Sequence, residues 1–296
     1  MSNATNISAL LKKVRQIEIK TKGLSNHIFS GEYSTAFKGR GMSFSEVRAY
    51  QYGDDVRSID WNVTARYADP HIKIFEEERE LTLLLLVDIS ASSLFGTSQK
   101  KRDTLTEICA TLAFSALGNN DKVGVLFFSD KVEKFIPPKK GKGHILYIIR
   151  ELLTREATPS ATLGGAKTNI EEVLRYANNV IKKRSIAFLL SDFISPDFSK
   201  SLRIAKKRHD IIGVHVYDPR DKELPNVGIV RVQDSENGEE AWLDTGVASL
   251  RKFYNERFEK KSKSIKEIFK KSGADLLSIS TADDYVKPLK GFFKSR

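Results

Sequence analysis

The chain has 296 residues, of which 40% are hydrophobic and 29% charged, and its formal net charge is +11. The apolar content is sufficient for a packed core, which excludes general disorder, and the length allows about two domains. A single cysteine, Cys109, excludes an internal disulfide framework and any metal site built from several cysteines.

The N-terminal region predicts neither a signal peptide nor a membrane span. Lys12, Lys13 and Arg15 are not followed by the apolar stretch that a signal peptide requires. An uninterrupted apolar run such as Leu83 to Val87 is far shorter than the ~20 residues that cross a bilayer. We therefore expect a cytoplasmic protein.

Residues 1–80 are predicted to form an N-terminal extension. Apolar residues at helical spacing between 7 and 19 predict a short amphipathic helix, which packs on its own domain or lies on a membrane. We favour packing. Between 22 and 80 the sequence lacks sustained periodicity and predicts loops and short strands. Trp61 is interpreted as a core or interface anchor rather than a ligand-stacking residue.

Residues 81–296 alternate between buried strands and helices. The expected strands lie at 81–87, 122–128, 186–190, 210–217 and 274–279. The expected helices lie at 101–117, 144–154, 168–183, 198–208, 246–271 and 283–294. This order is typical of an α/β fold with a doubly wound, mostly parallel sheet.

Three local signals refine this second part of the chain. Pro137-Pro138 and the glycines that follow predict a loop. Asn237-Gly238 between two alternating segments predicts a hairpin insertion near 227–244. Thr168 has Glu171 three residues later, the spacing of a capping box at a helix start.

A cluster of oxygen-bearing side chains is predicted where two strands end. Asp88-Ile-Ser90-Ala-Ser92 follows the first buried strand, and Asp192 follows a later one. Ligands of doubly wound sheets bind beyond the carboxyl ends of the strands, where Thr168 adds another hydroxyl. Carboxylates and hydroxyls without histidine or cysteine suit Mg²⁺. The alternative, that both serines only cap a turn or helix, is less favoured.

This residue set resembles the metal-ion-dependent adhesion site of von Willebrand factor A-type domains. The resemblance covers residues 80–220 and extends toward 280. It implies that Ser90, Ser92 and Thr168 ligate Mg²⁺, or Mn²⁺, directly. It also implies that Asp88 and Asp192 act directly or through water, and that the last coordination position takes an acidic residue of a partner protein.

A second block of motifs is similar to the bacterial domain of unknown function 58 family. The motif residues are Gly39, Gly41, Phe44, Glu46, Arg48, Tyr50, Gly53, Asp54, Asp55, Arg57, Ile59, Asp60, Trp61, Thr64, Ala65, Arg66 and the segment 76–79. The resemblance implies a role as an adaptor of MoxR-type AAA+ ATPases. One departure is Ser93, where the family commonly has methionine after the second serine. The arginines and aspartates of the block are predicted to fix the extension to the sheet, or else to form a second contact surface.

Two other classes of function are kept as alternatives to a non-enzymatic interaction module. Asp88 after a buried strand fits a Mg²⁺-dependent phosphoryl-transfer enzyme, although the second aspartate of such phosphatases is missing. Residues 246–296 carry 13 Lys and Arg against 6 Asp and Glu, which fits a nucleic-acid-binding protein. Acidic residues interleave there, as on exposed helices, and the sequence has none of the usual nucleotide-binding or hydrolase motifs.

Overall fold

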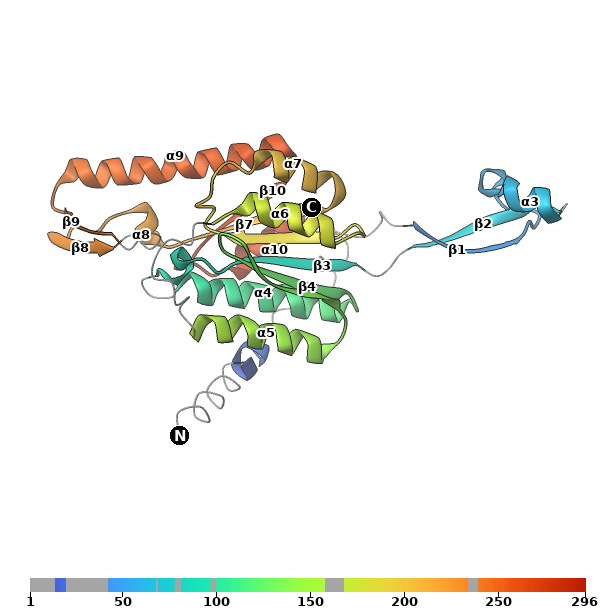
Figure 1. Cartoon of the computed structure of the whole chain (residues 1–296), viewed down its shortest axis with the longest axis horizontal. Coiled ribbons are helices and arrows are strands. Elements are labelled where there is room, and N and C mark those ends of the chain that lie inside the picture. The colour runs from blue at the N-terminus through green and yellow to red at the C-terminus, as the bar shows by residue number, and fades with distance from the viewer. Residues whose placement is uncertain are drawn as a thin grey trace.

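The computed structural model describes residues 14–19, 42–67, 69–77, 81–96, 100–157, 168–233 and 239–296. Its centre is a six-stranded sheet with the order β10-β7-β6-β3-β4-β5 (Figure 1). The strands are β3 (Thr82–Asp88), β4 (Lys122–Phe128), β5 (Val132–Lys139), β6 (Ile186–Ser191), β7 (Asp210–Tyr217) and β10 (Asp275–Ser280). All neighbours pair in parallel except β4 and β5, which pair antiparallel. The doubly wound, mostly parallel α/β fold is therefore confirmed.

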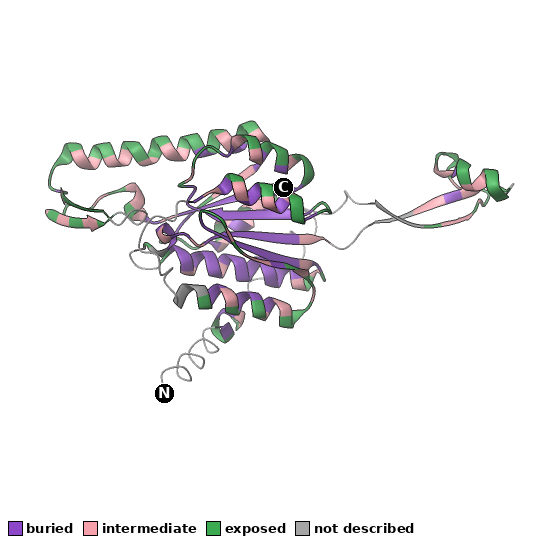
Figure 2. Cartoon of the chain, viewed as in Figure 1, coloured by how far each residue is buried: buried purple, intermediate pink, exposed green. Residues whose placement is uncertain are grey.

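Helices cover both faces of this sheet, as its apolar strands require. They are α4 (Lys101–Gly118), α5 (Lys142–Ala157), α6 (Ile170–Val180), α7 (Ser199–Arg208), α8 (Pro219–Lys222), α9 (Ala248–Ser272) and α10 (Val286–Ser295). In β3, Leu83 and Leu85 pack toward α4, α5 and α10, whereas Leu84 and Leu86 pack toward α6, α7 and α9. Figure 2 shows the resulting buried centre between the two helical layers.

The N-terminal helix belongs to this core where the structure describes it. Residues 14–19 are helical, and Val14 and Ile17 are buried against the α4 and α5 side of the sheet. Glu18 forms an ion pair of 2.6 Å with Lys142 of α5. This confirms packing on the protein's own core for these residues, while the predicted helical residues 7–13 lie outside the described ones.

The loop predicted at Pro137-Pro138 is wrong, because both prolines belong to strand β5. Proline cannot donate a ladder hydrogen bond, so strands tolerate it at the edge of a sheet. β5 is such an edge strand, bonded only to β4 among the described strands. A bulge in the pairing of β4 with β5 between Val123 and Val125 accommodates the prolines.

The second half of the N-terminal extension forms a two-stranded arm that projects from the end of the sheet where β3 begins (Figure 1). Its strands are β1 (Met42–Ala49) and β2 (His71–Glu77), and its tip carries η1 (Val56–Ser58) and α3 (Trp61–Tyr67). Trp61 is 70% exposed, so it is not a core residue, and its role as an interface anchor stays a prediction. The predicted division at residue 80 falls beside residues 78–80, which are outside the described ones.

Ionic contacts hold the arm together internally. Arg48 donates two hydrogen bonds, of 2.7 and 2.8 Å, to the carboxylate of Asp54. Asp60 caps α3 by accepting from the backbone N–H of Asn62 at 2.9 Å, and it forms an ion pair with Lys73 at 3.2 Å. Within the described residues these contacts link parts of the arm to each other. They therefore do not fix the extension to the sheet, contrary to the prediction.

The hairpin insertion is confirmed by β8 (Ile229–Gln233) and β9 (Glu240–Asp244), which pair antiparallel. Its expected turn at Asn237-Gly238 lies outside the described residues. Across the described part of the chain, no helix combines the length and the apolarity that crossing a membrane requires.

Candidate metal centre

The candidate site lies where the chain reverses direction across the sheet. From β3 the chain runs to β4 on one side and later returns to β6 on the other. The carboxyl ends of β3 and β6 therefore sit side by side at the switch point, where doubly wound sheets bind ligands. Asp88 is the last residue of β3, and Asp192 directly follows the last residue of β6.

Asp88 is the buried centre of this site, with 1% of its surface exposed. One carboxylate oxygen, Oδ1, accepts the backbone N–H of Ser90 at 2.9 Å. The other, Oδ2, accepts the hydroxyl of Ser191 at 2.5 Å and that of Thr168 at 3.4 Å. Thr168 therefore meets Asp88 across 80 residues of chain, as the interpretation as a metal site requires.

The two serines converge as their spacing predicts. The hydroxyl oxygens of Ser90 and Ser92 lie 3.0 Å apart, and both residues are buried. They stand at the start of the short helix η2 (Ala91–Leu94), where the side chain of Ser90 makes no capping hydrogen bond. The capping alternative for Ser90 is therefore wrong. Arg102 of α4 braces the turn by donating to the carbonyl of Ile89 at 2.6 Å.

The prediction that Thr168 caps the following helix is also wrong, because the cap is the next residue, Asn169. Asn169 is the N-cap of α6, and its side-chain oxygen accepts the backbone N–H of Glu172 at 3.1 Å. An asparagine caps a helix at least as well as a threonine. Because Asn169 performs this task, the hydroxyl of Thr168 is directed to Asp88 instead.

Asp192 is held by a lysine that sequence reasoning missed. Its Oδ2 lies 3.3 Å from the ammonium of Lys101, which also lies 2.8 Å from Asp221. Burial alone raises the pKa of Asp192, but Lys101, Lys261 and hydrogen bonds from Ile194 and Ser92 outweigh it and lower this pKa. Asp192 is therefore an ionised carboxylate in contact with Ser92.

Asp88 differs electrostatically from Asp192. Burial, followed by repulsion from the charge of Asp192, raises the pKa of Asp88 to about 6. Hydrogen bonds from Ser191 and Ser90 oppose this rise only in part. A cation bound between the two carboxylates would reduce the repulsion between them.

The donor set fits a hard divalent cation. Asp88, Ser90, Ser92, Thr168 and Asp192 contribute carboxylate and hydroxyl oxygens, and each residue is at most 7% exposed. Oxygen ligands suit Mg²⁺ and Mn²⁺. No group of three or more His, Cys, Asp and Glu side chains gathers in the described segments, so the candidate depends on this mixed set.

Sequence reasoning identified the five predicted donors but missed Ser191, Lys101 and Asp221. Ser191 was detectable in principle, because it ends a strand immediately before Asp192. Lys101 and Asp221 had no such signal. They reach the site from the first residue of α4 and from α8, and only the packing of these helices places them there.

Comparison with known proteins finds a matching family and several relatives. The family described as Protein of unknown function DUF58 matches residues 46–264. The uncharacterized protein Rv1480 of Mycobacterium tuberculosis is 32% identical over 291 residues, covering 97% of this chain and 90% of that protein. The uncharacterized protein YeaD of Bacillus subtilis is 25% identical over 142 residues, covering 48% of this chain and 31% of its own length.

Solved structures resemble the chain more remotely. A conserved hypothetical protein, BatB from Bacteroides thetaiotaomicron, has a TM-score of 0.46 at 14% identity, covering 73% of this chain and 98% of its own. The Rpn10 VWA domain has a TM-score of 0.35 at 13% identity, covering 71% and 93%. The match over residues 46–264 includes most of the arm and the whole candidate metal centre. The chain therefore belongs to the DUF58 family.

Proposed function

We propose that this chain is a non-enzymatic protein-interaction module that binds Mg²⁺, or Mn²⁺, and captures an acidic residue of a partner protein. The residues that would hold the cation are Asp88, Ser90, Ser92, Thr168 and Asp192. The observation that carries the proposal is their convergence, since five oxygen-bearing side chains from three separate segments meet at one buried point. When bound, the cation supplies a positive centre that attracts a carboxylate.

The hydrogen bonds of Asp88 support binding rather than phosphoryl transfer. A nucleophilic aspartate presents one carboxylate oxygen to its substrate. Here Oδ1 accepts from Ser90, and Oδ2 accepts from Ser191 and Thr168. A carboxylate bonded at both oxygens is placed to orient hydroxyl ligands, which favours the coordination role over the enzymatic alternative.

The proposed partner is a MoxR-type AAA+ ATPase, encountered in the cytoplasm. This part of the proposal depends on the resemblance of the block from Gly39 to Arg66, with segment 76–79, to the DUF58 family. The oxygen ligands of this chain leave one coordination position, which an acidic residue of the partner would fill. The interaction is therefore expected to depend on the metal.

The proposal is tested with purified components. Immobilised full chain should retain a MoxR-type ATPase in Mg²⁺ and release it in EDTA, and Asp88→Ala should abolish retention in both. Asp130→Ala is the matched control, because Asp130 is an exposed carboxylate two residues after the end of the neighbouring strand β4. Retention that is equal in Mg²⁺ and EDTA, and unaffected by Asp88→Ala, would contradict the coordination mechanism.

A further inference from the structure

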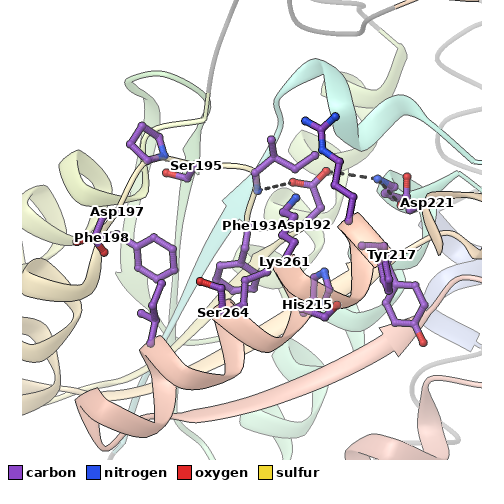
Figure 3. Close-up of a pocket in the computed structure, with 18 of the residues that line it drawn as sticks. Asp192, Phe193, Ser195, Asp197, Phe198, His215, Tyr217, Asp221, Lys261 and Ser264 are labelled. Carbon is purple, nitrogen blue, oxygen red and sulfur yellow. Dashed lines mark hydrogen bonds and ion pairs between the residues drawn. The ribbon is translucent and has the colours of Figure 1, made fainter. Parts of the chain in front are cut away.

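A groove of about 700 Å³ opens directly beside Asp192. One wall is the segment 192–198, which connects β6 to α7, and the other is α9. Figure 3 shows Lys261 rising from α9 near Asp192, with Phe193 and Phe198 between the two walls. A segment that places a residue at the metal centre can therefore also reach this groove.

Aromatic rings line the groove. Phe193 packs against Phe198 with ring centroids 5.9 Å apart and against His215 at 6.0 Å. Phe258 of α9 lies 5.4 Å from Tyr217 and 6.4 Å from His215. Phe193, Phe198 and His215 are buried and form the base of the groove. Tyr217 and Phe258 are half-buried and expose aromatic surface. Such a lining favours a large apolar side chain.

Phe193, at the base of the groove, has a strained backbone. Its φ is 55°, in the left-handed region that residues other than glycine rarely adopt. The hydroxyl of Ser191 accepts its N–H at 2.9 Å, and the same hydroxyl donates to Asp88. The turn that places Phe193 at the base of the groove is thus tied to the metal centre by one serine. Strain of this kind concentrates at binding sites.

The α9 wall of the groove carries basic side chains. Arg257 and Lys261 of α9 line it, and Arg257 is exposed. The acidic side chains of the lining already have partners, since Lys101 pairs with Asp192 and Asp221. The third, Asp197, accepts two hydrogen bonds of 3.0 Å from Ser199. Arg257 on the α9 wall is therefore placed to meet an anionic group, whereas the exposed Asp197 belongs to the opposite wall.

We infer that this groove binds a large apolar side chain of the partner, next to the acidic residue taken at the metal centre. The recognised segment is an acidic peptide with Phe, Tyr, Trp or Leu within about two residues of its Asp or Glu, since an extended chain advances about 3.5 Å per residue. This inference depends on the proposed function and adds the sequence class of the partner.

The test pans a phage-displayed library of random heptapeptides against the full chain in Mg²⁺. Selected peptides should carry Asp or Glu with a large apolar neighbour. A selected peptide should bind at least about tenfold more tightly than its version with alanine at the apolar position. Phe258→Ala should abolish that difference, whereas Phe253→Ala, an exposed phenylalanine of the same helix outside the groove, should preserve it.

A second pair of variants tests the charge without touching the packing. Arg257→Glu should weaken the selected peptide at least about tenfold, and Lys260→Glu, an exposed residue of α9 outside the lining, should have little effect. A different result is that the selected peptides need Mg²⁺ and an acidic residue, yet bind equally well with alanine at the apolar position and to Phe258→Ala and Arg257→Glu. That result would contradict binding in the groove but not the proposed metal centre. Selection of no acidic peptide, or binding that persists in EDTA, would overturn both.

Discussion

The ammonium of Lys101 lies 3.3 Å from a carboxylate oxygen of Asp192, and only 4% of the lysine side chain is exposed. Burial lowers the pKa of Lys101, but Asp192 and Asp221 outweigh it and raise this pKa, so the lysine remains charged. A fixed positive charge therefore sits beside one of the two carboxylates proposed to hold the cation. The charge of Lys101 keeps Asp192 and Asp221 paired when no cation is bound. The same charge weakens the attraction of the site for a cation.

Replacing this lysine should separate these two effects. Lys101→Met should raise Mg²⁺ affinity about tenfold, because a nearby unit charge no longer repels the cation. Without Mg²⁺ the variant should lose about 3 kcal/mol of stability, because the buried carboxylate of Asp192 and the half-buried one of Asp221 lose their partner. Calorimetric titration and thermal unfolding with and without Mg²⁺ measure both. Lys100→Met, at an exposed neighbouring position, is the control. Unchanged or weaker Mg²⁺ binding in Lys101→Met would contradict this account.

Metal binding should depend on pH through Asp88. Its pKa is raised to about 6, chiefly by burial, so protons compete with Mg²⁺ as the pH falls through this value. The increase in melting temperature that Mg²⁺ produces at pH 7.5 should be largely lost at pH 5. An increase that is equal at both pH values would show that Asp88 does not hold the ion.

The same shift predicts how stability changes without metal. A carboxyl group whose folded pKa exceeds its unfolded value of about 3.9 stabilises the fold at low pH, and this contribution is lost as the pH rises through about 6. In EDTA, Asp88→Asn should therefore be more stable than the wild-type chain at pH 7.5. The difference should shrink between pH 6 and 4, as measured by urea unfolding. A difference that is constant across this range would argue against a raised pKa.

His209 should contribute to acid unfolding. It is 2% exposed, and neither ring nitrogen has a hydrogen-bond partner in the described part of the structure. Burial, followed by the charges of Arg208 and Arg184, lowers its pKa to about 4. A histidine with a lowered folded pKa stabilises the fold above about pH 6.5, and this contribution is lost as the pH falls toward 4.

His209→Leu should remove this dependence. The free energy of unfolding of the variant should be about 1 kcal/mol higher than that of the wild-type chain at pH 7.5, because an unpartnered polar ring leaves the core. This difference should be larger at pH 5. Urea unfolding at the two pH values measures it. An equal difference at both would mean that His209 is protonated without cost.

Gly213 should not tolerate a side chain. It lies in β7, where an added Cβ would overlap the ring of Phe269 and lie 2.8 Å from a methyl carbon of Leu276. Gly213→Ala should cost about 1–3 kcal/mol through overpacking. Because Phe269 packs against Phe193 and Phe198, the same variant should weaken binding of an apolar side chain in the groove.

Gly118→Ala provides the control for this substitution. Gly118 is the last residue of α4, and an added Cβ would meet nothing within 4 Å. This variant should be neutral or gain up to about 1 kcal/mol, because alanine favours helix. Denaturant unfolding of both variants makes the comparison, and an unaltered stability of Gly213→Ala would refute the predicted overlap.

Local sequence patterns were sufficient for the alternation of strands and helices and for the choice of donor residues. Runs such as Leu83 to Val87 are buried on both faces, and such runs are typical of parallel strands covered by helices. The order of these strands, together with the rule that ligands bind beyond their carboxyl ends, predicted that Asp88 and Asp192 share one rim.

Tertiary structure decided what local patterns leave open. Pro137 and Pro138 are compatible with a strand only because β5 is at an edge. Thr168 faces Asp88 only because Asn169 caps the helix. Lys101 meets Asp192 across 91 residues of sequence, through the packing of α4 beside the end of β6. Periodicity records which face of an element is buried, whereas contacts between distant segments depend on how whole elements pack, and that has no local signature.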